Sequence, residues 1–195
     1  MPEFIRDILK VFIIHGPNGH SRENWFPWLK EELVKANPDI KAIVPDFPTG
    51  NNQSLENWLE AFEPFIKYID SNCIFVGHSL GPAFIFSLLE RVNTKIRAAF
   101  LVAPFVTRLG IQQFDKLNST FIEKDFDWDK IKSNCANFTV YASDNDPYVD
   151  MDKSRFVADH TGAKFKVVHG AGHFNAAAGY LKFEELLEDI NSIIE

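Results

Sequence analysis

A serine bracketed by two glycines stands between two apolar runs in the stretch CIFVGHSLGPAF, residues 73–84. The first run predicts a buried strand and the second a helix, so the motif GHSLG, residues 77–81, indicates the tight turn that presents a nucleophilic serine. Side chains at Gly77 and Gly81 would collide with the neighbouring strand and helix, whereas the hydroxyl of Ser79 would project above the sheet. The N-terminus of the helix puts partial positive charge where an oxyanion develops in acyl transfer. A tight turn with a capping serine is the alternative interpretation of this motif.

An acid suited to this chemistry follows a later apolar run. A serine nucleophile needs a base, and the base needs a carboxylate that orients it, in the chain order serine, acid, histidine. Asp144 and Asp146 follow the predicted strand NFTVYAS, residues 137–143. Asp146 is favoured because Pro147 restricts its backbone and fixes where the carboxylate points. Asp144 is interpreted as a turn residue that bonds its own backbone, and a turn role for both acids is the alternative.

The candidate base lies in the glycine-rich stretch HGAGHFNAAAG, residues 169–179. His173 sits in a loop that can carry its ring back over the end of the sheet, as the hydrolase arrangement requires. His169 is the rival, but it ends the predicted strand and is interpreted as part of the packing. His78 adjoins the serine, yet at such a turn its side chain is expected to point away, which favours a structural role.

A second glycine-bearing loop, IIHGPNGH at residues 13–20, follows the first predicted strand. A loop at this position supplies one backbone N–H of an oxyanion hole, and the N–H of Leu80 supplies the other. Pro17 has no N–H and cannot be the donor. Asn18 is the first candidate and Gly16 the second, although Pro-Asn-Gly is also typical of a simple β-turn.

The elements that would position these residues alternate along the chain. Short apolar runs without period-2 polarity predict strands buried on both faces, which is typical of a parallel sheet. Amphipathic stretches between them predict helices, and the alternation favours a layered α/β domain with right-handed crossovers. The predicted strands are 10–14, 40–45, 73–76, 97–104, 137–143 and 163–169, and the predicted helices are 24–37, 54–69, 81–92, 151–162 and 180–194.

Composition limits the classes of protein to consider. The 195 residues are 46% apolar, with 19 Phe and 4 Trp, and predict a single domain, residues 1–195, with an aromatic core. A net charge of -7 without a basic cluster argues against nucleic acid and anionic membranes as partners. The N-terminal stretch lacks an apolar run long enough for a signal segment. Cys73 and Cys135 are unclustered, so we expect reduced thiols in a cytoplasmic protein rather than a disulfide or a metal site.

Several of these motifs together resemble the retinoblastoma-binding protein 9 family of small α/β-hydrolases. The resemblance covers nearly the whole chain and rests on IIHG, NWFPWLKEEL, GHSLG, FDWDKIKSNC, ASDNDPYV and GHF. It implies Ser79 as nucleophile, Asp146 as acid and His173 as base, in agreement with the reasoning from the residues. It also implies a three-layer α/β/α sandwich, a trimmed α/β-hydrolase fold whose six parallel strands run in the order 2-1-3-4-5-6. The family activity is serine hydrolysis of small esters, and Pro17 departs from the expected oxyanion loop.

The resemblance also implies that the segment at about 105–134 stands where larger relatives carry a lid. It is too short for a separate domain, so we expect a short helical cover over the site. Phe105 is the leading candidate to line a substrate pocket, because it follows a strand end near the site. Trp25 and His15, near the oxyanion loop, are the other candidates. The alternative for the aromatic residues of the cover, Phe114, Phe121, Phe126 and Trp128, is that most pack the cover onto the body.

The functional expectation is therefore a serine hydrolase of the carboxylesterase type that cleaves small acyl esters. It needs no metal and no cofactor, and we expect a monomer or a weak dimer. A protein-binding module with a vestigial triad is one alternative, although the L-x-C-x-E motif that the family name suggests is absent around Cys73 and Cys135. A thioesterase or amidase that uses the same triad is the other alternative.

Overall fold

A parallel sheet forms the centre of the molecule. The computed structural model describes residues 8–194, and its six strands are all parallel in the order β2-β1-β3-β4-β5-β6. This order and the α/β class confirm the expected fold. The strands are β1 (Lys10–Ile14), β2 (Lys41–Ile43), β3 (Cys73–His78), β4 (Ala98–Val102), β5 (Phe138–Ser143) and β6 (Lys164–Val168).

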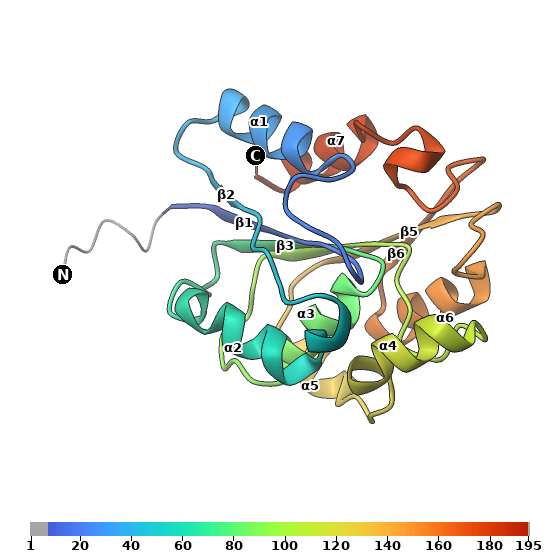
Figure 1. The fold of residues 1–195 in the computed structure, drawn as a ribbon. Coiled ribbons are helices and arrows are strands. Elements are labelled where there is room, and N and C mark those ends of the chain that lie inside the picture. Colours follow the sequence, from blue (N-terminus) through green and yellow to red (C-terminus); the bar gives the residue numbers. More distant parts are fainter. Residues whose placement is uncertain (1–7, 195) are drawn as a thin grey trace.

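Helices cover both faces of this sheet (Figure 1). Helices α1 and α7 lie on one face, and α2 to α6 lie on the other, which gives the three layers. None of the helices in residues 8–194 combines the length and the apolar character that crossing a bilayer would require. The helices are α1 (Phe26–Ala36), α2 (Leu55–Ile66), α3 (Gly81–Leu89), α4 (Gln112–Ile122), α5 (Trp128–Ser133), α6 (Met151–Thr161) and α7 (Glu184–Ile194).

Aromatic side chains fill the space between the layers. On the α2 and α3 side, Phe47 stacks on Trp58 at a ring distance of 4.5 Å, and Trp58 meets Phe121 of α4 edge-on at 4.9 Å. On the opposite face, Trp25 packs edge-on against Phe26 at 4.7 Å. Strands β1, β3 and β4 are buried throughout, as expected for strands covered on both faces.

The predicted start of the first helix is wrong. The sequence predicts a helix from residue 24, but the helix begins at Phe26, and the residue before it makes no side-chain capping bond. Asn24 instead has a left-handed backbone, with φ at 52°, and its Oδ1 accepts a hydrogen bond from the N–H of Ala176 at 2.9 Å. Helix α2 has a side-chain cap: the Oγ of Ser54 accepts from the N–H of Asn57 at 3.2 Å. Asn24 thus joins two loops rather than starting a helix.

The segment 105–134 holds two helices with different places in the fold. Helix α4 is joined to the α2 region, where the N–H of Leu55 donates to the Oγ1 of Thr120 at 2.9 Å. Helix α5 packs against α3 and α6. Both helices lie on the α3 side of the sheet (Figure 1). Because parallel strands end at one common edge, the loops after β1, β3, β5 and β6 converge there, and α4 lies beside them.

Candidate active site

Ser79 occupies a strained turn directly after β3. Its φ is 60°, a left-handed value that a non-glycine residue adopts only when the surroundings impose it. A Cβ at Gly77 would lie 2.7 Å from the Cδ1 of Ile85, and one at Gly81 would lie 2.6 Å from the carbonyl oxygen of Ile14. The two glycines therefore allow helix α3 and strand β1 to pack against the turn, as the motif predicts. The strand extends two residues further than expected, to His78, so the turn begins at Ser79 itself.

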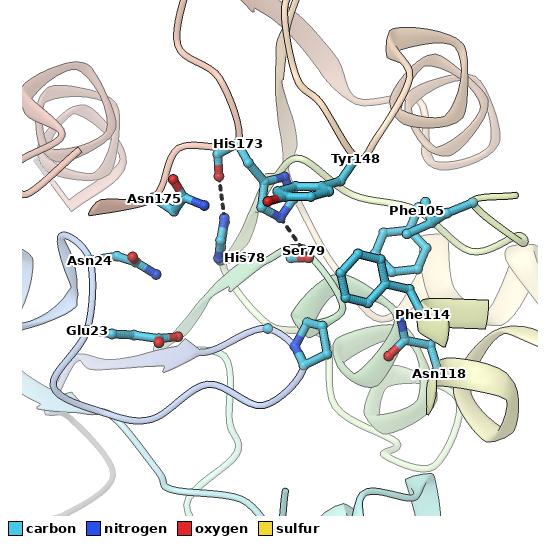
Figure 2. A pocket seen from close by; sticks show the side chains of 13 residues that line it. Glu23, Asn24, His78, Ser79, Phe105, Phe114, Asn118, Tyr148, His173 and Asn175 are labelled. Atoms are coloured by element: carbon cyan, nitrogen blue, oxygen red, sulfur yellow. Dashed lines mark hydrogen bonds between the residues drawn. The ribbon is translucent and has the colours of Figure 1, made fainter. Parts of the chain in front are cut away.

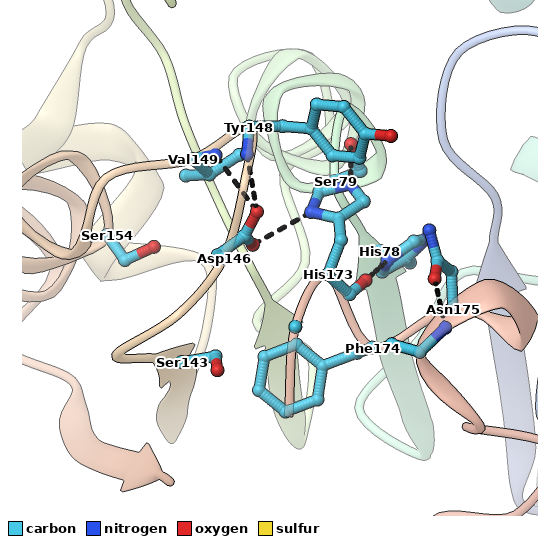
Figure 3. A network of polar contacts seen from close by, with 12 residues as sticks. His78, Ser79, Ser143, Asp146, Tyr148, Val149, Ser154, His173, Phe174 and Asn175 are labelled. Carbon is cyan, nitrogen blue, oxygen red and sulfur yellow. Dashed lines mark hydrogen bonds and ion pairs between the residues drawn. The ribbon is translucent and has the colours of Figure 1, made fainter. Parts of the chain in front are cut away.

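Ser79, His173 and Asp146 form a continuous chain of hydrogen bonds (Figure 3). The Nε2 of His173 lies 3.0 Å from the Oγ of Ser79, and its Nδ1 lies 2.8 Å from the Oδ2 of Asp146. A carboxylate only accepts, so Nδ1 carries the proton and the Nε2 lone pair faces the serine hydroxyl. The Asp146 side chain is 1% exposed, and its Oδ1 accepts from the N–H groups of Tyr148 at 2.9 Å and Val149 at 3.1 Å. This geometry is suited to general-base activation of the serine.

The two rival residues pair with each other outside this chain. The Oδ2 of Asp144 lies 2.6 Å from the Nδ1 of His169, and its Oδ1 accepts from the N–H of Gly170 at 2.8 Å. The Gly170 hydrogen bond, followed by the His169 contact, lowers the pKa of the Asp144 carboxyl. Both side chains are solvent-exposed. Asp144 and His169 therefore close a surface turn.

His78 does not point away from the site as expected. Its ring lines the cavity, and its centroid lies 4.9 Å from that of His173. Its Nε2 donates to the carbonyl oxygen of His173 at 2.8 Å. Burial lowers the pKa of His78 to about 3, so the ring is neutral at neutral pH. His78 thus holds the main chain of His173, the histidine that faces Ser79. This is a structural role, as expected, but one that positions the site from within it.

Trp25 is not a pocket residue. It is fully buried, and its Nε1 donates to the carbonyl oxygen of Phe174 at 2.9 Å. Phe174 has a left-handed backbone, with φ at 50°, next to His173. Together with the Asn24–Ala176 hydrogen bond, this contact joins the start of α1 to the histidine loop. Trp25 therefore fixes the loop that carries His173 and does not line the cavity beside Ser79.

The loop after β1 differs from the expectation at Asn18 and His15. The N–H of Asn18 donates to the Oε1 of Gln53 at 2.9 Å, so it is occupied and does not point at an oxyanion. His15 is fully buried and does not line the cavity. Its Nε2 accepts from the N–H of Phe47 at 3.1 Å, and its Nδ1 donates to the carbonyl oxygen of Gly16 at 2.7 Å. Burial lowers the pKa of His15, so this neutral ring fixes the loop.

Gly16 and Leu80 are the remaining oxyanion candidates. A Cβ at Gly16 would lie 2.9 Å from the Cβ of Ser79 and 3.4 Å from its Oγ, so the loop backbone passes close to the hydroxyl. Leu80 is fully buried and directly precedes helix α3. Both residues thus lie beside the serine, at the positions where backbone N–H groups act in this fold.

A cavity of about 230 Å³ opens beside Ser79, and its two sides differ in chemistry (Figure 2). Phe105, which the sequence singled out, lines the apolar side. Of the other aromatic residues in segment 105–134, Phe121 is buried in the core, and the half-buried Phe126 and Trp128 pack against it. The apolar side is lined by Phe105, Phe114 and Tyr148, with Asn118 among them, and the polar side by Glu23, Asn24, His78 and Asn175. Leu109 also lines the cavity.

Sequence reasoning did not find Glu23, Asn118 or Tyr148. The sequence does hold a clue to Tyr148, because this residue stands two positions after Asp146. In the structure its ring meets that of His173 edge-on at 5.1 Å. The sequence holds no such clue to Glu23 or Asn118, since each lies in a polar stretch that is typical of the protein surface. Burial raises the pKa of Glu23. Among residues 8–194, no cluster of three or more His, Cys, Asp or Glu side chains has the arrangement of a metal site.

Comparison with known proteins places this geometry in a family. Residues 11–192 match the family model described as Serine hydrolase. YdeN of Bacillus subtilis (strain 168) is 30% identical over 174 residues, which are 88% of this chain and 88% of YdeN. Serine hydrolase RBBP9 of Rattus norvegicus is 25% identical over 187 residues, 95% of each chain. The resemblance drawn from the motifs thus holds at the level of the wider family, with YdeN at higher identity than RBBP9.

Solved structures agree with this assignment. The crystal structure of the ydeN gene product from B. subtilis has a TM-score of 0.89 at 27% identity, and the match covers 95% of this chain and 98% of that one. Est1E from Butyrivibrio proteoclasticus, with ferulic acid bound, has a TM-score of 0.69 at 18% identity over 98% of this chain and 93% of that one, which shows the shared fold. The chain belongs to the Serine hydrolase family.

Proposed function

We propose that this protein is a carboxylesterase that hydrolyses small acyl esters through Ser79, His173 and Asp146. One observation carries the proposal: a single chain of hydrogen bonds runs from the Ser79 hydroxyl through both nitrogens of His173 to a buried carboxylate. Such an arrangement raises the nucleophilicity of a serine hydroxyl and is the hallmark of acyl transfer.

The proposed reaction has two halves. The Oγ of Ser79 attacks the ester carbonyl carbon while the Nε2 of His173 takes the hydroxyl proton, and the N–H groups of Leu80 and Gly16 stabilise the oxyanion. Collapse of the intermediate breaks the C–O bond, and His173 gives its proton to the departing alcohol. Water then attacks the acyl-enzyme carbonyl with His173 again as base; the bond to the Ser79 Oγ breaks, His173 returns the proton to that Oγ, and the carboxylic acid leaves. Asp146 holds the imidazole in the required tautomer throughout.

The size of the cavity favours short acyl chains. Its volume of about 230 Å³ is small for a ligand site, and Phe105 and Phe114 close its apolar side. Turnover should therefore fall from butanoate towards long-chain esters. Cys73 and Cys135 are both free and buried, which fits the reducing compartment that we infer for the protein.

A panel of p-nitrophenyl esters of increasing chain length tests this proposal. Turnover should be lost in Ser79→Ala and kept in Ser133→Ala, a matched change of an exposed serine hydroxyl on α5. A fluorophosphonate probe should label wild type once, at Ser79. Probe labelling at another residue, or equal turnover by Ser79→Ala, would contradict the proposal. Labelling without ester turnover would instead favour a thioester or amide substrate.

A further inference from the structure

One polar atom beside Ser79 is not explained by its apolar surroundings. Asn118 of α4 is 0% exposed and lines the cavity together with Phe105 and Phe114. Its side-chain nitrogen, Nδ2, has no hydrogen-bond partner within the described part of the chain. Buried polar groups in native proteins are nearly always paired, and a buried donor without an acceptor is costly, so this one calls for an explanation.

The orientation of the Asn118 amide follows from a relay through Gln53. The N–H of Asn18 donates to the Oε1 of Gln53 at 2.9 Å, so Gln53 must present its Nε2 at the other end of its amide. That Nε2 donates to the Oδ1 of Asn118 at 3.0 Å, with the carbonyl oxygen of Leu117 at 3.4 Å. An amide nitrogen cannot accept, so Asn118 must turn its oxygen towards Gln53. Its two N–H groups are therefore held at the opposite end of the amide.

Gln53 itself is buried, with 7% exposure, which makes the relay rigid. It connects the loop after β1 with the cover helix α4. Figure 2 shows the Asn118 side chain beside Phe114, on the same side of Ser79 as Phe105. The apolar side of the cavity thus contains one buried, fixed amide donor and the Tyr148 hydroxyl and, apart from these, hydrocarbon and aromatic rings. A purely alkyl chain would bury this donor without a partner.

Building on the proposed esterase function, we propose that Asn118 determines specificity by donating through Nδ2 to an oxygen in the acyl chain of the substrate. The substrate class is then short-chain esters whose acyl group carries an ether or keto oxygen, rather than simple fatty acyl esters. A site built around a polar contact discriminates against analogues that lack the partner group, because its own polar atom is then left unpaired. The expected preference is about tenfold in kcat/KM.

Ether-for-methylene pairs of equal length test this inference. The p-nitrophenyl esters of methoxyacetate and butanoate form one pair, and those of 3-methoxypropanoate and pentanoate form another. The measured quantity is the ratio of kcat/KM within a pair, compared between wild type and Asn118→Leu, so that the intrinsic reactivity of each ester cancels. Leucine keeps the shape of asparagine without the donor. The ratio should fall about tenfold in the variant for at least one pair.

A second variant keeps Asn118 but turns its amide nitrogen away from the cavity. In Gln53→Glu, assayed at alkaline pH, the carboxylate still accepts from Asn18 but can no longer donate, so Asn118 should flip and turn its oxygen into the cavity. The ether preference should then be lost here too. Gln113→Glu, the same change at an exposed position of α4, is the matched control and should keep the wild-type ratio. Unchanged ratios in both Asn118→Leu and Gln53→Glu, or equal losses for both members of every pair, would overturn the inference.

Nuclear magnetic resonance separates this inference from the esterase proposal. In Ser79→Ala, the side-chain amide protons of Asn118, assigned by their absence in Asn118→Leu, should shift further downfield with the ethyl ester of methoxyacetate than with that of butanoate. Equal shifts would overturn the role of Asn118 even if all the esters are hydrolysed. If the shift is larger with the ether but the wild-type protein hydrolyses none of the esters, the esterase proposal is refuted. The role of Asn118 in binding the ether oxygen is then still supported.

Discussion

Replacing Asp146 by Asn tests the proposed triad with little change to the fold. The Oδ1 of Asp146 accepts two backbone N–H groups, from Tyr148 and Val149. An Asn oxygen can keep both bonds, which turns the Asn amide nitrogen towards the Nδ1 of His173, where the carboxylate oxygen now lies at 2.8 Å. Because that nitrogen donates, Nδ1 must become the acceptor. The proton then moves to Nε2, which can no longer take the proton of Ser79.

The size of the effect follows from this change of tautomer. The same substitution in a serine protease lowers kcat about 10⁴-fold, which corresponds to about 5 kcal/mol of transition-state stabilisation. We expect a loss of the same order in Asp146→Asn, because its carboxylate side chain is 1% exposed and water cannot replace it easily. The assay is kcat for p-nitrophenyl butanoate, with the melting temperature measured in parallel to show that the fold is retained.

Asp144→Asn is the control, because Asp144 stands two residues away and also contacts a histidine. It is exposed, and an Asn there can still accept from the N–H of Gly170, so turnover should stay near wild type. A crippled Asp144→Asn together with an active Asp146→Asn would refute the assignment of the acid. Activity near wild type in both variants would show that neither carboxylate orients His173.

Three further predictions concern burial and packing around the site. Burial lowers the pKa of His78 from 6.5 to about 3, so the unfolded chain binds a proton that the folded chain excludes, and stability is lost as pH falls below 6.5. In urea titrations at several pH values, His78→Gln should lose stability less steeply over that range, and an unchanged slope would contradict a neutral buried ring. Burial raises the pKa of Glu23 above 4.5, which disfavours its charged form on folding. Glu23→Gln should therefore have a higher Tm than wild type at neutral pH, and the difference in Tm should disappear as pH falls below 4.5. A lower Tm for the variant at neutral pH would contradict an unfavourable charge on Glu23. Gly81→Ala places a Cβ 2.6 Å from the carbonyl oxygen of Ile14 and should lose about 1–3 kcal/mol in the free energy of unfolding, so unaltered stability would show that the turn can relax.

The fold and the three residues of the hydrogen-bonded chain could be predicted because their signals are local. Buried parallel strands appear as uninterrupted apolar runs, and the residues of interest follow directly at their carboxyl ends. Gly77 and Gly81 mark the turn because only glycine tolerates the close approach of α3 and β1. Pro147 distinguishes Asp146 from Asp144 through backbone restriction alone. Each of these inferences uses neighbours within a few positions of the chain.

The pocket could not be predicted, because it depends on contacts between distant segments. Trp25 and His15 looked like lining residues from their place in the sequence, yet packing turns both rings inwards. Asn118 lies in a polar stretch of α4, and only its bond to Gln53, 65 positions earlier, shows that one end of its amide is fixed. Asn18 is the first oxyanion candidate by its place in the sequence, but its N–H donates to the same glutamine.

The residues that fix the loops share one kind of contact that local patterns do not reveal. His15 donates to the carbonyl oxygen of Gly16 at 2.7 Å, His78 to that of His173 at 2.8 Å, and Trp25 to that of Phe174 at 2.9 Å. Each is a buried ring that binds the main chain rather than a side chain, so the contact depends on where the carbonyl lies in space. Burial lowers the pKa of both histidines, which keeps them neutral and makes each ring nitrogen a fixed donor or acceptor. The loops around Ser79 are therefore held in place before a substrate binds, which is what electrostatic stabilisation of a transition state requires.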